Sequence, residues 1–213
     1  MVQIKTFVFN PFQENTYLVY DDDTGQCFLI DPGCHFEQEQ QELTGYIARN
    51  NLEPQYIVHT HGHIDHVLGI NFVKDHYQIP AVMHPSDLEV LRKSQEFGSS
   101  IGLEIEQPSD PEILLEDDQN LHIGEAVFRV LHVPGHSPGS IALYHALGGI
   151  VFTGDALFRR GIGRTDLMGG DFSTLMHSIR SRLFTLPGQT VVYPGHGEPS
   201  TIGEEQKDNP LLK

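Results

Sequence analysis

Four short segments rich in histidine, aspartate and glycine each follow an apolar run, and this arrangement constrains the fold more than any other feature of the sequence. They are Thr60-His61-Gly62-His63-Ile64-Asp65-His66, Pro134-Gly135-His136-Ser137-Pro138-Gly139, Thr153-Gly154-Asp155 and Pro194-Gly195-His196-Gly197. Polar residues at the ends of strands meet at one edge of a sheet, and glycine lets the backbone come close to whatever that edge binds. We therefore expect an α/β chain whose strand ends gather these side chains into one site.

The run from Thr60 to His66 places four side chains that can bind metal in a single loop. In extended chain His61 and His63 point to the same side, because side-chain direction repeats every two residues. Asp65 and His66 lie where the chain turns into a predicted helix, so the loop can serve two adjacent ions. Imidazole and carboxylate ligands suit zinc, manganese or iron in a hydrolytic site. Taken alone, the loop has the alternative interpretation of a solvated histidine-rich turn.

The spacing of apolar residues predicts strands in alternation with helices. Strands are expected at 4–9, 16–20, 27–30, 56–59, 80–84, 126–133, 140–145, 149–153 and 190–193, and helices at 36–50, 66–77, 86–97 and 172–186. A capping box of Ser86 and Glu89 is expected to open the third helix, and Asp171 or Ser173 to cap the fourth.

Two polar segments bear on domain organisation. Residues 98–119 are rich in acidic residues, glycine and proline, which marks either a surface excursion or, as we prefer, the seam between two halves of one domain. The tail, 203–213, is polar and contains a proline, so we expect it to lie on the surface.

Composition narrows the classes of protein further. The 29 acidic and 13 basic residues give a net charge of -16, which disfavours general binding to the phosphate backbone of nucleic acids. No apolar run approaches the roughly 18 residues of a membrane span, and the N-terminus reads as strands and not as a signal peptide. Two cysteines are too few for a disulfide framework. We expect one cytoplasmic domain over 1–213, with neither a nucleic-acid nor a membrane partner. The sequence does not determine the oligomeric state.

The ordered motifs resemble those of a known family. THGHIDH, PGHSPGS, TGDALF and PGH, in this order, closely resemble the metallo-β-lactamase superfamily of hydrolases, and the flanking ENTYLV, LIDPG and GIGRTDLMGGD runs resemble its glyoxalase II (hydroxyacylglutathione hydrolase) branch in a short bacterial form. The resemblance covers about residues 1–210. It implies an αββα sandwich with the site at one edge of the facing sheets. It also implies that one metal is held by His61, His63 and His136 and a second by Asp65, His66 and His196, with Asp155 bridging both.

The resemblance implies a hydrolase of S-acylglutathione or a related thioester, with two divalent ions, zinc by preference and iron or manganese as alternatives. Two such cations about 3.5 to 4 Å apart lower the pKa of a shared water toward neutrality and so supply hydroxide, while polarising the substrate carbonyl. This chemistry needs neither a Ser-His-Asp nor a Cys-His arrangement. Asp65 and the metals are the candidates for handling the proton, which makes Asp65 the candidate catalytic residue.

One departure from the family pattern concerns substrate recognition. Full-length glyoxalase II enzymes carry, after the last histidine ligand, a helical domain that helps to hold glutathione, and only 17 residues follow His196 here, so we expect that domain to be missing. Arg164 corresponds to the family's glutathione-contacting basic residue, but Asp166 replaces the aromatic residue expected two positions later. Arg164 is thus a candidate substrate contact, with a turn or a salt bridge to Asp166 as the alternative, and leaving-group recognition is expected to be loose or different.

Two other functions share these residues. A persulfide dioxygenase on the same fold would bind one iron through His61, His63 and Asp155 or His136, and a non-catalytic metal-binding protein would have a blocked pocket. His59, His132 and His145 are expected to be structural, and Cys34 to be a buried thiol. Asp31 either orients a ligand histidine or belongs to an ordinary turn.

Overall fold

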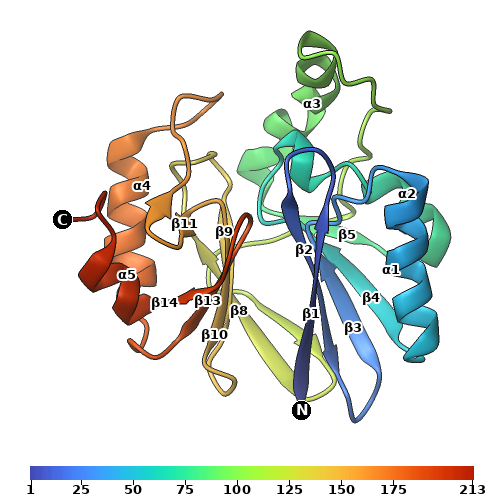
Figure 1. Cartoon of the computed structure of the whole chain (residues 1–213), viewed down its shortest axis with the longest axis horizontal. Helices are drawn as coiled ribbons and strands as arrows, with labels where there is room; N and C mark the ends of the chain where they lie inside the picture. Colours follow the sequence, from blue (N-terminus) through green and yellow to red (C-terminus); the bar gives the residue numbers. More distant parts are fainter.

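Two six-stranded sheets face each other in the computed structural model, which describes residues 1–213 (Figure 1). The first sheet has the order β1 (Val2–Phe9), β2 (Glu14–Asp21), β3 (Gln26–Ile30), β4 (Glu53–Val58), β5 (Ala81–Met83) and β6 (Ile113–Leu114). The second has the order β14 (Ser200–Thr201), β13 (Val191–Pro194), β10 (Ile150–Gly154), β9 (Ile141–His145), β8 (Ala126–His132) and β7 (Asn120–Ile123). A small hairpin joins β11 (Leu157–Phe158) to β12 (Gly161–Ile162).

Helices cover the outer faces of both sheets. On the first sheet these are α1 (Glu37–Arg49) and α2 (Ile70–Tyr77), with α3 (Leu88–Ser100) at one end, and on the second they are α4 (Phe172–Ser178) and α5 (Ile202–Asp208) (Figure 1). Short helical turns occupy Ile64–His66, Pro85–Asp87 and Ile179–Leu183. None of these helices combines the length and the apolar character that crossing a membrane requires.

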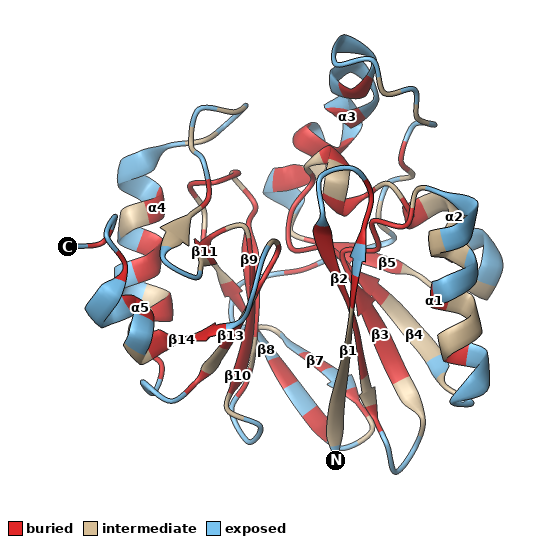
Figure 2. Ribbon diagram, in the orientation of Figure 1, coloured by how far each residue is buried: buried red, intermediate tan, exposed pale blue.

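The core is layered, and central strands such as β2 and β10 are buried on both faces, one against the other sheet and one against the helices (Figure 2). Between the sheets, Phe28 of β3 packs edge to face on Phe128 of β8 with ring centroids 4.9 Å apart. Outside the first sheet, Leu43 of α1 packs with the strands, and outside the second Leu175 of α4 does so. The predicted αββα sandwich is confirmed.

Parallel pairing determines where the loops gather. Strands β3, β4, β5 and β6 are mutually parallel, and β10 is parallel to β13. Parallel strands end at the same edge of their sheet, so the loops after β10 and β13 come together. The loop after β4 meets the second sheet at this edge, where the N–H of Ile141 donates to the carbonyl of Thr60 at 2.9 Å. Helices connect β3 to β4, β4 to β5 and β10 to β13, as parallel pairing demands.

Several local predictions were wrong. Ser86 caps no helix, because it lies inside the turn Pro85–Asp87; α3 begins at Leu88 with Asp87 as the preceding residue, and it runs to Ser100 instead of ending at 97. The helix expected from 66 begins only at Ile70, after a separate turn. The tail is partly helical, since Thr201 and Glu204 form the capping box that opens α5.

The seam that we preferred for residues 98–119 describes only part of this segment. Residues 101–112 form no regular element and are largely exposed, whereas Ile113–Leu114 add β6 to the first sheet and β7 then opens the second. The segment therefore contains both a surface excursion and the crossing between sheets. Strands β6, β7, β11, β12 and β14 were not predicted.

Candidate metal centre

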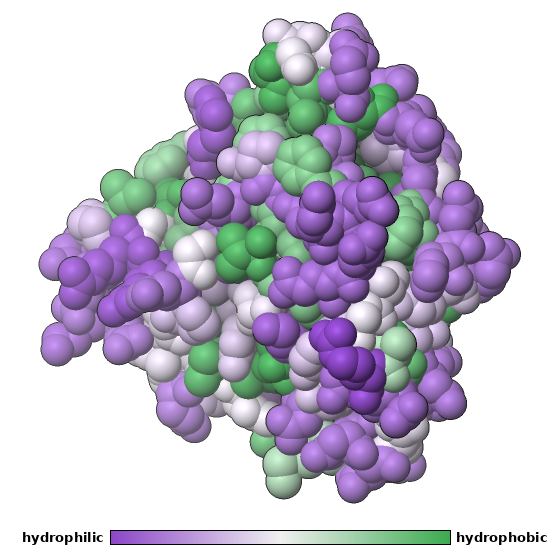
Figure 3. All heavy atoms as spheres, turned by 45° about the vertical axis from the view of Figure 1, so that its right-hand side comes forward, coloured by the Kyte–Doolittle hydropathy of each residue, from purple (hydrophilic) through white to green (hydrophobic).

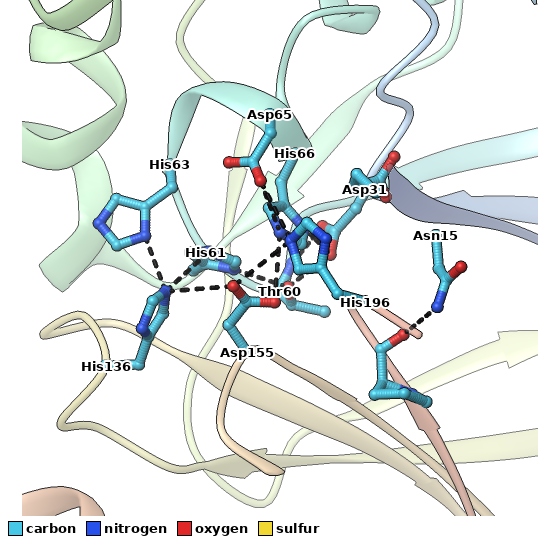
Figure 4. A network of polar contacts seen from close by, with 12 residues as sticks. Asn15, Asp31, Thr60, His61, His63, Asp65, His66, His136, Asp155 and His196 are labelled. Carbon is cyan, nitrogen blue, oxygen red and sulfur yellow. Dashed lines mark hydrogen bonds and ion pairs between the residues drawn. The ribbon is translucent and has the colours of Figure 1, made fainter. Parts of the chain in front are cut away.

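All seven predicted ligand side chains meet at one edge of the two sheets (Figure 4). Those of the first loop follow β4, His136 follows β8, Asp155 follows β10 and His196 follows β13. Six of them form two three-residue groups, each with its ligand atoms within 4.8 Å of one another, and Asp155 is the seventh. The groups are His61, His63 and His136, and Asp65, His66 and His196.

The first group consists of three imidazoles. Nδ1 of His63 lies 2.8 Å from Nε2 of His136, and that Nε2 lies 3.3 Å from Nε2 of His61. His61 and His136 are buried. Three nitrogens converging at this distance match the three-histidine sets that bind zinc while leaving a position for water.

The second group mixes imidazole with carboxylate. Oδ2 of Asp65 lies 3.1 Å from Nε2 of His196 and 3.7 Å from Nε2 of His66. Asp155 lies between the two groups. Its Oδ1 is 3.3 Å from Nε2 of His66, while its Oδ2 is 3.6 Å from Nε2 of both His136 and His196. One carboxylate thus faces ligand atoms of both groups.

Contacts of Nδ1 with oxygen atoms leave Nε2 of three histidines directed into the site. Nδ1 of His66 donates to Asp31 at 2.9 Å, and Nδ1 of His136 donates to the carbonyl of Arg164 at 2.7 Å. Nδ1 of His196 faces the carbonyl of Gln13 at 3.3 Å. Because backbone and carboxylate oxygens only accept, they require the Nδ1–H tautomer, in which Nε2 carries the lone pair that binds metal.

The orientation of His61 is determined through Thr60. The Thr60 hydroxyl donates to Oδ2 of Asp31 at 2.5 Å and lies 3.0 Å from Nδ1 of His61. Since its proton is engaged with Asp31, the hydroxyl oxygen accepts from His61, which again leaves Nε2 free. Asp31 therefore serves both groups, directly at His66 and through Thr60 at His61, and the orienting role is favoured over the ordinary turn.

The pKa values of the ligand histidines shift in opposite directions. Burial and then the neighbouring charges of other histidines hold the pKa of His61 well below its usual value and lower the pKa of His63 to about 3. At His66 burial acts to lower the pKa, but the charges of Asp155, Asp65 and Asp31 outweigh it and raise the pKa well above its usual value. The positive charge of His66 in turn keeps the pKa of Asp155 low despite its burial. Such a concentration of shifted groups is typical of a functional site.

Asp87, which lies in none of the ligand motifs, connects the loops of the first group. Its fully buried carboxylate accepts from the backbone N–H of Gly62 at 2.7 Å, the Ser137 hydroxyl at 2.8 Å and the N–H of Gly139 at 2.5 Å. Gly62 separates His61 from His63, and Ser137 follows His136. One side chain therefore fixes the positions of two loops that are far apart in sequence.

The ENTY residues hold the loop that carries His196. The Asn15 side chain (Figure 4) donates to the carbonyls of Pro194 at 3.0 Å and Gly197 at 2.9 Å. The Tyr17 hydroxyl donates to the carbonyl of Pro194 at 2.6 Å. Gly195 has to be glycine, because a Cβ there would collide with the Asp155 carboxylate.

Arg164 reaches the rim of the site but is already paired. It lines the cavity beside the metal groups, yet its guanidinium donates from Nε and Nη2 to the two oxygens of Asp166 at 2.7 and 2.8 Å. Both side chains are exposed. The salt bridge, stated as the alternative role, is therefore present.

The remaining polar candidates lie outside the two groups. His59 is fully buried, with Nδ1 3.8 Å from Asp31 and no hydrogen-bond partner, while His132 and His145 contact the backbone carbonyls of Pro138 and Val127. Cys34 is a free, buried thiol, as expected.

Comparisons with known proteins agree with this geometry. A family model described as the metallo-beta-lactamase superfamily matches residues 9–196. The chain is 39% identical over 203 residues to a probable metallo-hydrolase, YqgX, of Bacillus subtilis, covering 95% of this chain and 93% of that one. It is 34% identical to the hydroxyacylglutathione hydrolase GloC of Haemophilus influenzae, covering 94% and 93% respectively.

Two solved structures superpose over almost the whole chain. BLEG-1, described as a B3 metallo-β-lactamase, has a TM-score of 0.90 at 36% identity, covering 99% of this chain and all of that one. TTHA1623, solved in a di-iron-bound form, has a TM-score of 0.88 at 39% identity, covering 98% of this chain and all of that one. The chain belongs to the metallo-β-lactamase superfamily and is a probable metal-dependent hydrolase.

Proposed function

We propose that the protein is a dinuclear metal-dependent hydrolase of S-acylglutathione or related thioesters. The observation that carries this proposal is the position of Asp155, whose two oxygens face ligand atoms of both three-residue groups. A shared carboxylate between two ligand sets is what a pair of adjacent cations requires. The assignment is His61, His63 and His136 to one ion, Asp65, His66 and His196 to the other, and Asp155 to both.

The chain's own atoms fit such a pair of ions. Nε2 of His66 and Oδ1 of Asp155 are buried and have no hydrogen-bond partner, although buried polar atoms in proteins are nearly always paired. A cation between them would satisfy both. The donor set is nitrogen and oxygen throughout, which suits zinc, our preferred metal, and also iron or manganese. TTHA1623, at 39% identity, carries two irons.

Thioester hydrolysis adds water across the bond between the carbonyl carbon and sulfur, and gives a carboxylic acid and a thiol. When bound, two metal ions supply a nucleophile from water near neutral pH and polarise the carbonyl. The proton that water loses has to reach the departing sulfur. Asp65 lines the cavity, and its Oδ2 lies 3.1 Å from Nε2 of His196 within the second group. We assign this carboxylate the transfer of that proton.

The thioester assignment also draws on relatives. GloC, 34% identical over nearly the full length, is a hydroxyacylglutathione hydrolase, and the ENTYLV and GIGRTD runs resemble that branch. We propose a small-molecule thioester as the partner. The free, buried thiols of Cys27 and Cys34 accord with the reducing cytoplasm as the location.

The test is an activity assay with matched variants. Protein reconstituted with zinc, manganese or iron is assayed on S-lactoylglutathione, on neutral thioesters and on nitrocefin, because BLEG-1 is described as a β-lactamase. We expect thioester hydrolysis that Asp155→Ala abolishes and that Asp75→Ala, on helix α2, leaves unchanged. Activity on nitrocefin alone, or oxygen consumption with a persulfide and a single iron, would overturn the proposal.

A further inference from the structure

A cavity of about 580 Å³ opens beside the two metal groups. This volume falls within the range of about 300 to 1,000 Å³ that is typical of small-molecule sites. His63, Asp65, His136, Asp155 and His196 line its polar side. The cavity therefore has room for a substrate arm extending well beyond the reacting carbonyl.

Six apolar side chains from three parts of the chain line the rest of the wall, alongside Ser94, Ser100 and three charged side chains. The β1–β2 loop, the region from the metal loop through α3, and the loop before α4 contribute Phe12, Ile64, Val90, Phe97, Leu167 and Met168. Ile64 and Val90 are buried, but Phe97 and Met168 remain 44% and 40% exposed. In Figure 3 apolar side chains reach the surface around α3, at the top of the view. Large apolar side chains left in water at the mouth of a cavity are a common mark of a binding surface.

The positions of this wall and the metals are fixed relative to each other. Gly62, between His61 and His63, lies so close to α3 that a Cβ would come within 2.7 Å of the backbone nitrogen of Leu91. Leu91 is itself fully buried in the core beneath the first sheet. Helix α3 is therefore anchored directly on the metal loop, and Phe97, two turns further along, is held beside the metals.

The cations at the rim have carboxylates beside them. Arg164 is bound through two hydrogen bonds to Asp166, and Lys93 on α3 lies 3.7 Å from Glu89, one turn away. Glu96 also lines the cavity. With a net charge of -16, the chain presents an unfavourable field to an anionic arm away from the two metal ions. A carboxylate arm would have to displace Asp166 from Arg164 to gain an equivalent bond.

We propose, building on the thioesterase function above, that this cavity selects thioesters with an uncharged apolar arm, which lies between α3 and the loop at Leu167 and Met168. Phe97 and Met168 determine this specificity. The apolar arm belongs to either the acyl group or the thiol of the substrate. Varying the chain length of each group in turn shows which of the two the cavity binds.

The binding test uses thioethers, which resemble the substrate but cannot be hydrolysed. We titrate the metal-loaded protein with the S-methyl and S-hexyl thioethers of N-acetylcysteamine, which is neutral, and of glutathione. Each buried methylene contributes about fourfold to affinity, corresponding to about 0.8 kcal/mol. We expect S-hexyl compounds to bind at least tenfold tighter than S-methyl compounds, and S-hexylglutathione to bind no tighter than the neutral S-hexyl compound.

A matched pair of variants tests the wall. Phe97→Ala should weaken S-hexyl binding by about tenfold and S-methyl binding by less than twofold. Ile101→Ala serves as the control, because Ile101 is 48% exposed at the end of the same helix and does not line the cavity. Equal affinity for the methyl and hexyl compounds, or equal losses in the two variants, would overturn the inference. So would tighter binding of S-hexylglutathione than of the neutral S-hexyl compound.

Turnover then identifies the arm and separates this inference from the function on which it rests. Hexanoyl and acetyl thioesters of N-acetylcysteamine vary the acyl group, and acetyl thioesters of hexanethiol and N-acetylcysteamine vary the thiol. We expect kcat/KM to rise at least tenfold with chain length in one series. If hydrolysis occurs but neither series responds to length, the inference fails and the thioesterase function stands. If the hexyl thioethers bind as expected and no thioester is hydrolysed, the thioesterase function fails and the apolar site stands.

Discussion

Asp31 Oδ2 accepts a hydrogen bond from Nδ1 of His66 at 2.9 Å, and both side chains are buried. The same carboxylate accepts from the backbone and hydroxyl of Thr60, and the hydroxyl in turn contacts His61. A single carboxylate thus sets the tautomer of one histidine in each metal group. It touches neither the cavity nor a substrate, so its contribution is to metal affinity.

Replacing Asp31 should therefore weaken metal binding. Asp31→Asn keeps the size of the side chain, and asparagine tolerates the left-handed backbone at this position, where φ is 48°. The amide presents a donor to groups that already donate, so affinity should fall by about 10- to 100-fold, the typical cost of losing such a supporting contact. Competition with a chromogenic chelator measures it. Unchanged affinity, equal to that of the exposed control Asp75→Asn on α2, would contradict the orienting role.

Asp87→Asn should reduce both stability and the affinity of the first metal group. The buried Asp87 carboxylate accepts from three donors, and an amide can accept at only one of its two ends. Each donor left unpaired in the interior costs about 1 to 3 kcal/mol. We expect urea unfolding to show a loss of about 2 kcal/mol or more. Ser137→Ala removes only one of the three contacts and should cost less; an equal or greater loss would show that Asp87 is not the centre of this network.

Asp155→Ala should lower the affinity for both ions, since its carboxylate offsets part of the repulsion between two dications. His63→Ala removes a ligand of the first group only, so it should lower the affinity for one ion and leave the affinity for the other unchanged. Elemental analysis after dialysis against graded chelator distinguishes these patterns. Two ions retained tightly by Asp155→Ala, together with most of the activity, would exclude the bridging role.

Acid sensitivity is expected at a pair of stacked histidines away from the metals. The rings of His84 and His132 lie 4.0 Å apart, and burial, followed by the charge of His132, lowers the pKa of His84 to about 4 although Asp117 opposes this. A lowered histidine pKa means that the unfolded chain binds more protons below pH 6.5, so stability falls as the pH drops from about 6.5 toward 4.

The matched variant for that pair is His84→Asn, whose side-chain oxygen can still accept from the N–H of Ser86 as Nδ1 of His84 does at 3.3 Å. We measure the urea concentration at which half of the protein is unfolded, at pH 7 and at pH 5. The difference between these two concentrations should be larger in the natural protein than in this variant. The same pH dependence in both would mean that the stacked pair contributes nothing to acid sensitivity.

The local motifs were the predictable part of the site. Each ligand segment joins an apolar run to a glycine-rich turn, so its place at a strand end follows from short-range sequence, and Asp31 was recognised as a candidate for the same reason. Asp87 was missed because a serine three residues before a glutamate suggested a capping box, and because its partners, Gly62 and Ser137, are distant in sequence. Only tertiary structure reveals such a contact.

Among the elements that were not predicted, some had a signal in the sequence and others had none. Helix α5 had a readable signal, the Thr201 to Glu204 capping box, which the polar and proline-containing tail obscured. Strands β6 and β14 contain two residues each, too few for any periodicity. The apolar wall of the cavity could not be predicted. Phe97 and Met168 come from opposite halves of the chain and face each other only across the cavity.

A metal titration of the metal-free protein, with thioester hydrolysis as the readout, tests whether two ions are needed for the reaction. Zinc, manganese and iron are each added in steps while bound metal and the release of thiol are measured in the same samples. The dinuclear account predicts that binding saturates near two ions per chain and that hydrolysis appears as the second ion binds. Saturation near one ion with every metal, or two bound ions without hydrolysis of any thioester, would contradict it.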